Sequence, residues 1–304
     1  MADDIASLAG RFEEERQRLR AVAYRMLGSL AEADDAVQEA WLRLDRSAAD
    51  EIANLPAWLT TVVSRVCLNM LRSRRTRGEE PLEAQLPPTP ARAVEDAGRD
   101  PEQEALMADS VGVALLVVLD TLTPAERLSF VLHDMFSVPF DEIGPMIERT
   151  PAAARQLASR ARRRVRGGAG SSGAVGSDSA ARRLRVVDAF LAATRGGDLQ
   201  ALVSLLHPDV VLYADAAVIP TPEPVTVRGA QTVAQGAMAA TGRARFTGVA
   251  LLDGAVGLVM APLGELRVVL AFSFAPDSDL IDGIDVVAEP ERLKGIEVAV
   301  ADAA

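Results

Sequence analysis

The sequence predicts a multidomain protein with two all-α helical domains, the second containing a helix-turn-helix, followed by an α+β domain. Residues 8–77 and 106–166 carry apolar side chains at helical spacings of three and four. Within residues 180–304 the pattern changes to two helices and then short apolar runs between turns, which is typical of a sheet packed against helices. Two segments separate these parts: an acidic, proline-containing linker at 78–105 and a Gly/Ser-rich linker at 167–179.

The first domain is expected to contain three amphipathic helices, at Phe12–Met26, Ala31–Leu44 and Pro56–Arg75. Gly28 ends the first helix, and Ser29 followed by Glu32 predicts a capping box for the second. Proline suits the first position of the third helix because its missing N–H would have no helical partner there. This helix ends on a cluster of arginines.

The second domain has the pattern of a helix-turn-helix. Thr123 and Glu126 predict a capping box for a helix that runs to Met135. Ser137–Pro139 interrupt it, and a short helix is expected at Phe140–Ile147 before the next turn. A short helix, a turn and a basic helix in this order are typical of proteins that place the last helix in the DNA major groove.

The basic helix carries the strongest indication of function. Thr150 suits its N-cap, Pro151 suits its first position, and residues 150–166 hold six arginines and no acid in a chain of net charge −11. Apolar residues recur on one side of this helix, and Arg and Gln, which can form paired hydrogen bonds to guanine and adenine edges, fall opposite. We predict a DNA recognition helix; the alternative is a three-helix bundle with a basic surface. The side chains expected to read base edges are Arg155, Gln156, Ser159 and Arg160.

The last domain is predicted to begin with two helices. Ala181–Arg195 forms the first, and Asp198 caps a second that runs through Leu206. Short apolar runs that alternate with turns then predict strands. These are Val210–Tyr213, Val225–Arg228, Phe246–Leu252, Ala255–Met260, Leu266–Phe274 and Leu280–Val287.

Composition narrows the class of protein further. The single cysteine, Cys67, excludes an internal disulfide and fits a reducing cytoplasm. The acidic N-terminus does not resemble a signal peptide, and no apolar window reaches the length of a membrane helix. The two histidines, His133 and His207, fall in different domains and there is no cysteine pair, so we expect no metal site and no cofactor. A cytoplasmic protein without a membrane partner is predicted.

Three motifs in order resemble the extracytoplasmic-function (ECF) sigma factors of bacterial RNA polymerase. Asp34-Asp35-Ala-Val-Gln38-Glu39 resembles the family's polymerase-binding helix. Pro56-Ala-Trp58-Leu59 through Leu71-Arg72 resembles its −10 recognition and melting helix, and Leu132-His133-Asp134 through Arg162 resembles its −35 domain. The resemblance covers residues 8–77 and 106–166 and implies two partners, core RNA polymerase (its clamp and flap) and promoter DNA.

The resemblance assigns roles residue by residue. It implies that Asp34, Asp35, Gln38 and Glu39 meet the polymerase clamp, although a solvated helix face is the ordinary fate of such charges. It implies −10 contacts from Arg65, Asn69, Arg72, Arg74 and Arg75. Near the −35 element, Arg162, Arg163, Arg164 and Arg166 are expected to contact phosphate. Trp58 could stack on a base, but Leu59 and Val62 beside it favour a core position.

The last domain is similar to the SnoaL-like fold, a cone-like α+β domain that a subgroup of these sigma factors carries at the C-terminus. In that subgroup the fused domain tunes activity, which implies regulatory contacts. Two motifs of the subgroup align here with Asp215 and with the segment that contains Pro290 and Leu293. The glycines and lysine that follow the aspartate in the subgroup are absent from this chain, and only the proline and leucine of the second motif are kept.

Other functions remain open at the level of sequence. SnoaL-like folds enclose an apolar pocket, so a small-molecule ligand in the C-terminal domain is a possible regulatory input, and some members are enzymes. His207 and Asp209 flank Pro208 at a helix-to-strand junction, where a turn role is favoured over acid–base catalysis, and we expect no enzyme. The second hypothesis is a stand-alone helix-turn-helix regulator with a ligand-sensing or weakly catalytic C-terminal domain.

Overall fold

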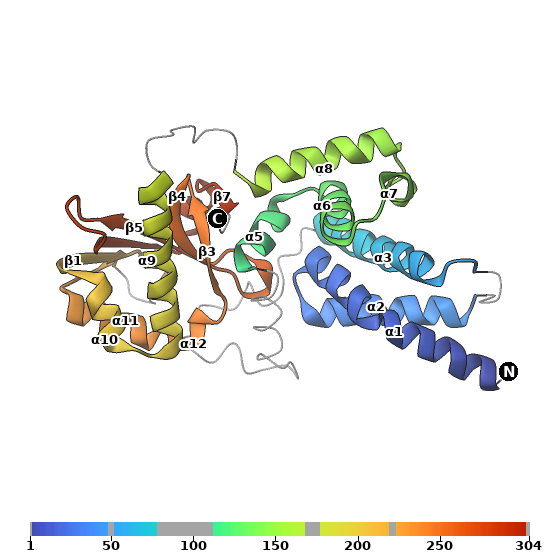
Figure 1. Cartoon of the computed structure of the whole chain (residues 1–304), viewed down its shortest axis with the longest axis horizontal. Coiled ribbons are helices and arrows are strands. Elements are labelled where there is room, and N and C mark those ends of the chain that lie inside the picture. The colour runs from blue at the N-terminus through green and yellow to red at the C-terminus, as the bar shows by residue number, and fades with distance from the viewer. Residues whose placement is uncertain (1, 48–51, 78–111, 168–176, 219–222, 302–304) are drawn as a thin grey trace. The chain divides into compact units, whose positions relative to one another are not determined.

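The structure is a computed structural model that describes residues 2–47, 52–77, 112–167, 177–218 and 223–301. It divides into a helical unit, residues 1–85 with 119–162, and an α+β unit, residues 86–118 with 163–304. Helices followed by a sheet-containing domain confirm the predicted fold class (Figure 1). Both predicted linkers, 78–105 and 167–179, lie largely outside the described residues.

The helical unit begins with three packed helices, α1 (Ala2–Leu27), α2 (Leu30–Asp45) and α3 (Leu55–Arg77). Gly28 ends α1 with a positive φ of 76°, as predicted, because glycine enters this region without a Cβ penalty. The predicted capping box of α2 is wrong. Ser29 is the N-cap but its side chain makes no capping hydrogen bond, and Glu32 pairs with Arg74 of α3 instead.

The helix-turn-helix also belongs to the helical unit. Thr123 accepts from the N–H of Glu126 and Glu126 reaches back to the N–H of Thr123, so this predicted capping box is confirmed. The helix that follows widens into a π-helical turn, and Ser137 ends it with a φ of 56°. The elements are α5 (Val113–Thr121, divided between the units), α6 (Pro124–Phe130), η3 (Val131–Met135), α7 (Phe140–Met146) and α8 (Pro151–Val165, whose residues after 162 fall in the α+β unit).

The α+β unit contains a seven-stranded sheet of order β2-β1-β6-β5-β4-β3-β7. The strands are antiparallel to their neighbours except for the parallel pair β1 and β6. The sequence predicted the first six strands and missed β7. The strands are β1 (Leu206–Ala214), β2 (Val225–Arg228), β3 (Thr247–Leu252), β4 (Ala255–Met260), β5 (Val268–Phe274), β6 (Ile281–Val287) and β7 (Val298–Val300).

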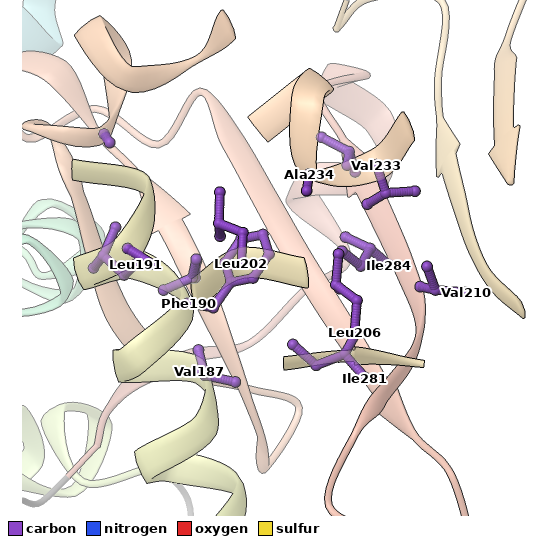
Figure 2. Close-up of a cluster of buried hydrophobic side chains, with 14 of the residues drawn as sticks. Val187, Phe190, Leu191, Leu202, Leu206, Val210, Val233, Ala234, Ile281 and Ile284 are labelled. Carbon is purple, nitrogen blue, oxygen red and sulfur yellow. The ribbon is translucent and has the colours of Figure 1, made fainter. Parts of the chain in front are cut away.

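Helices cover one face of this sheet. Helix α9 packs on β3 and β4, while α10 and α11 pack on β1 (Figure 1). Phe190 and Leu202 from these helices meet Ile284 from the sheet in the buried cluster of Figure 2. The helices are α9 (Ser177–Gly196), α10 (Leu199–Leu205), α11 (Ala230–Ala239), α12 (Thr241–Ala244) and α13 (Pro290–Lys294), with a short 3₁₀ turn η4 (Pro262–Gly264).

The thiol of Cys67 yields a test of how tightly the first three helices pack. Cys67 lies in α3 with no exposed surface, and burial raises the pKa of its thiol to about 12 from 9.0. Since the thiolate is the reactive form, a thiol-specific reagent at pH 8 should label the folded chain roughly 1000-fold more slowly than the denatured chain. The labelling rate with and without denaturant measures this.

The same shift predicts how stability depends on pH. Because the folded pKa lies above the unfolded one, the buried neutral thiol contributes stability that is present below pH 9.0 and is lost as pH rises through about 12. A Cys67→Ser variant should show a weaker alkaline loss than the native chain. Rapid labelling of the folded chain without denaturant would contradict the buried placement.

Candidate nucleic-acid interface

The turn before α8 sets the direction of the basic helix. Gly144 lies so close to this turn that a Cβ there would be 2.9 Å from the carbonyl oxygen of Arg149 and 3.0 Å from the nitrogen of Pro151. Glu148 adopts a positive φ of 56°, and the N–H of Arg149 donates to the carbonyl of Gly144 at 2.9 Å. The Thr150 hydroxyl accepts from the N–H of Ala153 at 3.2 Å, which confirms the predicted N-cap.

Helix α8 buries one stripe of small residues, Ala154, Ala158 and Ala161, and exposes the opposite side. At 3.6 residues per turn, Gln156 and Arg163 point most directly away from this stripe. Arg155 and Arg162 lie two turns apart on one flank. Of the predicted −35 residues, Arg155, Gln156, Ser159, Arg160 and Arg163 are exposed and Arg162 is half-buried.

The two flanking arginines contact the preceding helix. The Nε of Arg162 donates to Asp134 in η3 at 2.6 Å. The guanidinium of Arg155 lies over the ring of Phe140, 5.3 Å from its centroid, and His133 of η3 stacks on the same ring. The sequence did not reveal these contacts, because they depend on how η3 faces α8.

Helix α3 places part of the predicted −10 set together. Arg65, Asn69 and Arg72 follow one another at spacings of four and three, so they share one face, and all three are exposed. Arg74 lies about half a turn away from this stripe. It pairs with Glu32 and donates to the carbonyl of Leu27 at 3.4 Å. The side chain of Arg75 lies outside the described residues.

The acidic face of α2 is partly neutralised. Asp34 forms a two-point ion pair with Arg20, at 2.7 and 3.0 Å, and Glu39 accepts from Arg43 at 2.9 Å. Asp35 and Gln38, the other two members of the predicted polymerase-binding set, are exposed on this face. Leu42, one turn after Gln38, is 37% exposed, and sequence reasoning did not assign it a role. Leu42 lies seven residues after Asp35, which places the two residues on the same face of the helix, and this spacing could have identified it.

The C-terminal domain brings its two predicted motif segments together. The buried carboxylate of Asp215 accepts from the N–H groups of Ala288 and Glu289 at 2.8 and 2.9 Å, immediately before α13. Arg292 approaches the same carboxylate at 3.5 Å and donates to Asp285 at 2.8 Å. The Asp215 carboxylate therefore anchors the start of α13.

Helix α13 itself lies at the surface. Its first residue, Pro290, is exposed and Leu293 is half-buried. Lys294 donates to Glu291 at 2.8 Å, and this hydrogen bond lowers the pKa of the Glu291 carboxyl. These side chains form a small polar surface around the anchored segment.

The candidate acid–base pair of the enzyme alternative has a local structural role. The Nδ1 of His207 accepts from the backbone N–H of Asp209 at 3.2 Å across Pro208, which is a turn contact. Within the described ranges, no three His, Cys, Asp or Glu side chains gather as metal ligands would. No helix among the described residues is both long and apolar enough to cross a membrane.

Comparisons with known proteins point to one family. Residues 11–77 match the family model described as Sigma-70 region 2. The chain is 44% identical over 205 residues to the ECF RNA polymerase sigma factor SigJ of Mycobacterium tuberculosis, covering 67% of this chain and 64% of that protein. It is 37% identical over 195 residues to the probable ECF RNA polymerase sigma factor SigI of the same species, covering 64% of this chain and 65% of that protein.

A solved structure is similar as well. The crystal structure of M. tuberculosis extracytoplasmic function sigma factor SigJ aligns with 94% of this chain and 98% of its own length, at 32% identity and a TM-score of 0.43. The matched segments span slightly less than two thirds of the length of the curated relatives.

The anchoring carboxylate generates a stability prediction. Asp215→Asn keeps the shape of the side chain but removes its charge and turns one of the two carboxylate oxygens, both of which accept from backbone N–H groups, into a donor. We expect the free energy of unfolding of the C-terminal domain to fall by about 1.5–3 kcal/mol, the usual value for a hydrogen bond to a charged group. Denaturant unfolding measures this.

The exposed Asp209 supplies the matched control. Asp209→Asn should change the free energy of unfolding by less than about 0.5 kcal/mol, as is usual for surface substitutions. If the two variants lower the free energy of unfolding equally, the hydrogen bonds of Asp215 do not stabilise the domain more than an exposed carboxylate does.

Proposed function

We propose that this chain, which belongs to the family of ECF RNA polymerase sigma factors, binds core RNA polymerase and directs transcription initiation at specific promoters. The observation that carries the proposal is the pair of exposed basic faces, Arg65, Asn69 and Arg72 on α3 and the outer side of α8. The first lies inside the match to Sigma-70 region 2. A sigma factor has no catalytic chemistry of its own, and we assign none to this chain.

The two basic faces would contact different promoter elements. The stripe on α3 would hold the unstacked −10 strand, which needs phosphate contacts and an accommodating surface. On α8, Arg155, Gln156, Ser159 and Arg160 would read −35 base edges, while Arg163 and Arg166 would contact phosphates. Arg74 is the weakest member of the −10 set, because its guanidinium is engaged with Glu32 and the end of α1.

Core polymerase would meet the exposed face of α2. Asp35 and Gln38 offer a carboxylate and an amide there, and Leu42 adds an apolar group beside them. A buried apolar anchor ringed by polar contacts is a common composition of strong interfaces. Asp34 and Glu39 would contribute less, since Arg20 and Arg43 already neutralise them.

The C-terminal domain would tune this activity. Its unit includes residues 113–118, and a Cβ on Gly248 of β3 would lie 2.9 Å from the Cβ of Val113, so β3 packs closely on the start of α5. Helix α5 leads directly into the helix-turn-helix. A domain that packs on the start of α5 would restrict the movement of the −35 domain, with or without a bound small molecule.

Run-off transcription with purified core polymerase and a random promoter pool tests the proposal. Transcripts that share −10 and −35 elements are expected from the full chain. Binding to DNA without binding to core polymerase would instead support a stand-alone helix-turn-helix regulator.

The −35 assignment makes a specific prediction. Arg160→Ala should relax the base preference at one −35 position by about 1–3 kcal/mol, the value of one lost bidentate pair, and leave core binding intact. Selection from the promoter pool by reconstituted holoenzyme measures this. Arg166→Ala is the control and should weaken all promoters alike; a parallel loss of core binding in Arg160→Ala would refute the assignment.

The assignment of α2 to polymerase binding makes a second specific prediction. Asp35→Arg reverses an exposed charge that has no partner among the described residues, and it should weaken core binding at least about tenfold through like-charge repulsion with a basic clamp surface. Promoter preference among the complexes that still form should not change. A binding titration against core polymerase checks this, with the exposed Asp277→Arg of the C-terminal domain expected to bind as the native chain does.

A further inference from the structure

Phe140 occupies an unusual place for a phenylalanine. It is the first residue of α7 and its ring is only half-buried, outside the hydrophobic core. The ring of His133 lies nearly parallel to it, with 3.9 Å between centroids and 9° between planes. The same ring lies under the guanidinium of Arg155 at 5.3 Å. One aromatic ring therefore touches side chains from both the preceding helix and α8.

The ring fixes an arginine that would otherwise be free to rotate. Arg155 is exposed, and among the described residues the Phe140 ring is the one partner of its guanidinium. A cation within about 6 Å of an aromatic centroid is attracted to the ring face. Holding a long side chain in place before binding removes part of the entropy cost that it would pay at the interface.

The position of Arg155 gives this contact a consequence for DNA. Arg155 lies in the second turn of α8, near the end where helix-turn-helix proteins place base contacts. It lies on the flank of α8 that faces η3, whereas Gln156 points outward. A planar guanidinium set in a defined direction at this flank could present its paired donors to one base edge.

We propose that Phe140 is a positioning residue for −35 specificity: its ring, backed by His133, orients the Arg155 guanidinium toward a single base pair. The inference rests on the proposed sigma function. Phe140 itself touches no base; it acts through Arg155. The nearby ion pair of Arg162 with Asp134 fixes a second arginine on the same flank, so this side of α8 is ordered before DNA arrives.

Base preference within one reaction provides the test. Holoenzyme reconstituted from core polymerase and each full-length variant transcribes a promoter pool in which the −35 positions are randomised, and the transcribed templates are sequenced. Because preferences are ratios between templates in the same tube, a smaller folded fraction cancels. The variants are Phe140→Leu, Phe140→Tyr, Arg155→Ala and the double variant Phe140→Leu with Arg155→Ala.

A matched control exists in the same domain. Phe136 is also half-buried and also lies under an arginine at 5.3 Å, but that arginine, Arg25, belongs to α1 and not to α8. Phe136→Leu makes the same chemical change and should leave the −35 preferences as in the native chain.

The proposal predicts that Phe140→Leu weakens preference about two- to five-fold at the same −35 position that Arg155→Ala affects, the size of an exposed cation–π contact. Phe140→Tyr should retain the native preference, and Phe140→Leu should add nothing once Arg155 is alanine. An unchanged or sharper preference in Phe140→Leu, or an effect that persists without Arg155, overturns it. If Arg155→Ala changes the base preference at no −35 position, the proposal is overturned too. Absence of promoter-specific transcripts from the native chain would instead reject the proposed function itself.

Discussion

The buried guanidinium of Arg127 joins the helix-turn-helix to the end of α1, and the position of the DNA-binding elements depends on it. Only 4% of Arg127 is exposed, and its Nη1 donates at 2.8 Å to the carbonyl of Met26 in the last turn of α1. Its Nη2 donates at 2.8 Å to Asp120. The last carbonyls of a helix have no partner within the helix and carry partial negative charge, so they suit a buried cation. An unpaired charge at this depth would cost several kcal/mol, and the donor geometry thereby fixes where α6 begins relative to α1.

Some arginines of this chain bind carbonyl or carboxylate groups of the protein, and others are exposed to solvent. Arg74 and Arg127 bind carbonyl groups at the end of α1, and Arg20 and Arg43 neutralise acids on α2. Others, such as Arg65 on α3 and Arg163 on α8, are exposed at the surface. Two proteins with the same arginine count could therefore present very different fields to DNA, since local arrangement decides where a polyanion binds.

Sequence patterns predicted what depends on local chemistry. Caps at Thr123 and Thr150, the glycine stop at Gly28 and six of the strands follow from rules that act over a few residues, and the structure confirms them. The failed capping box shows the limit. Glu32 meets Arg74, which is far along the chain, and a charged partner of that kind outweighs a neutral backbone N–H.

Site residues were harder to predict than elements. The resemblance implied −10 contacts from Arg74 as well as from Arg65, Asn69 and Arg72, but only the last three share an exposed face of α3. The link from Asp215 to the residues before Pro290 joins the ends of the neighbouring strands β1 and β6, which lie far apart in the sequence, so no short window of sequence reveals it. Helix α11 was missed because its alanines, glycine and glutamines form no clear apolar stripe.

The π-helical turn at Val131–Met135 has a consequence for how this chain can change in length. A π turn holds one more residue than an α turn, and such turns often sit at functional sites. A π turn accommodates one extra residue within the helix, so losing a residue there would restore α-helical spacing and leave the direction of the following segment nearly unchanged. In a regular α-helix the same loss would rotate everything that follows by about 100°. His133 and Asp134 lie inside the turn and contact Phe140 and Arg162 beyond it, so we expect a single deletion to disturb these two contacts directly and not through a rotation of the helix.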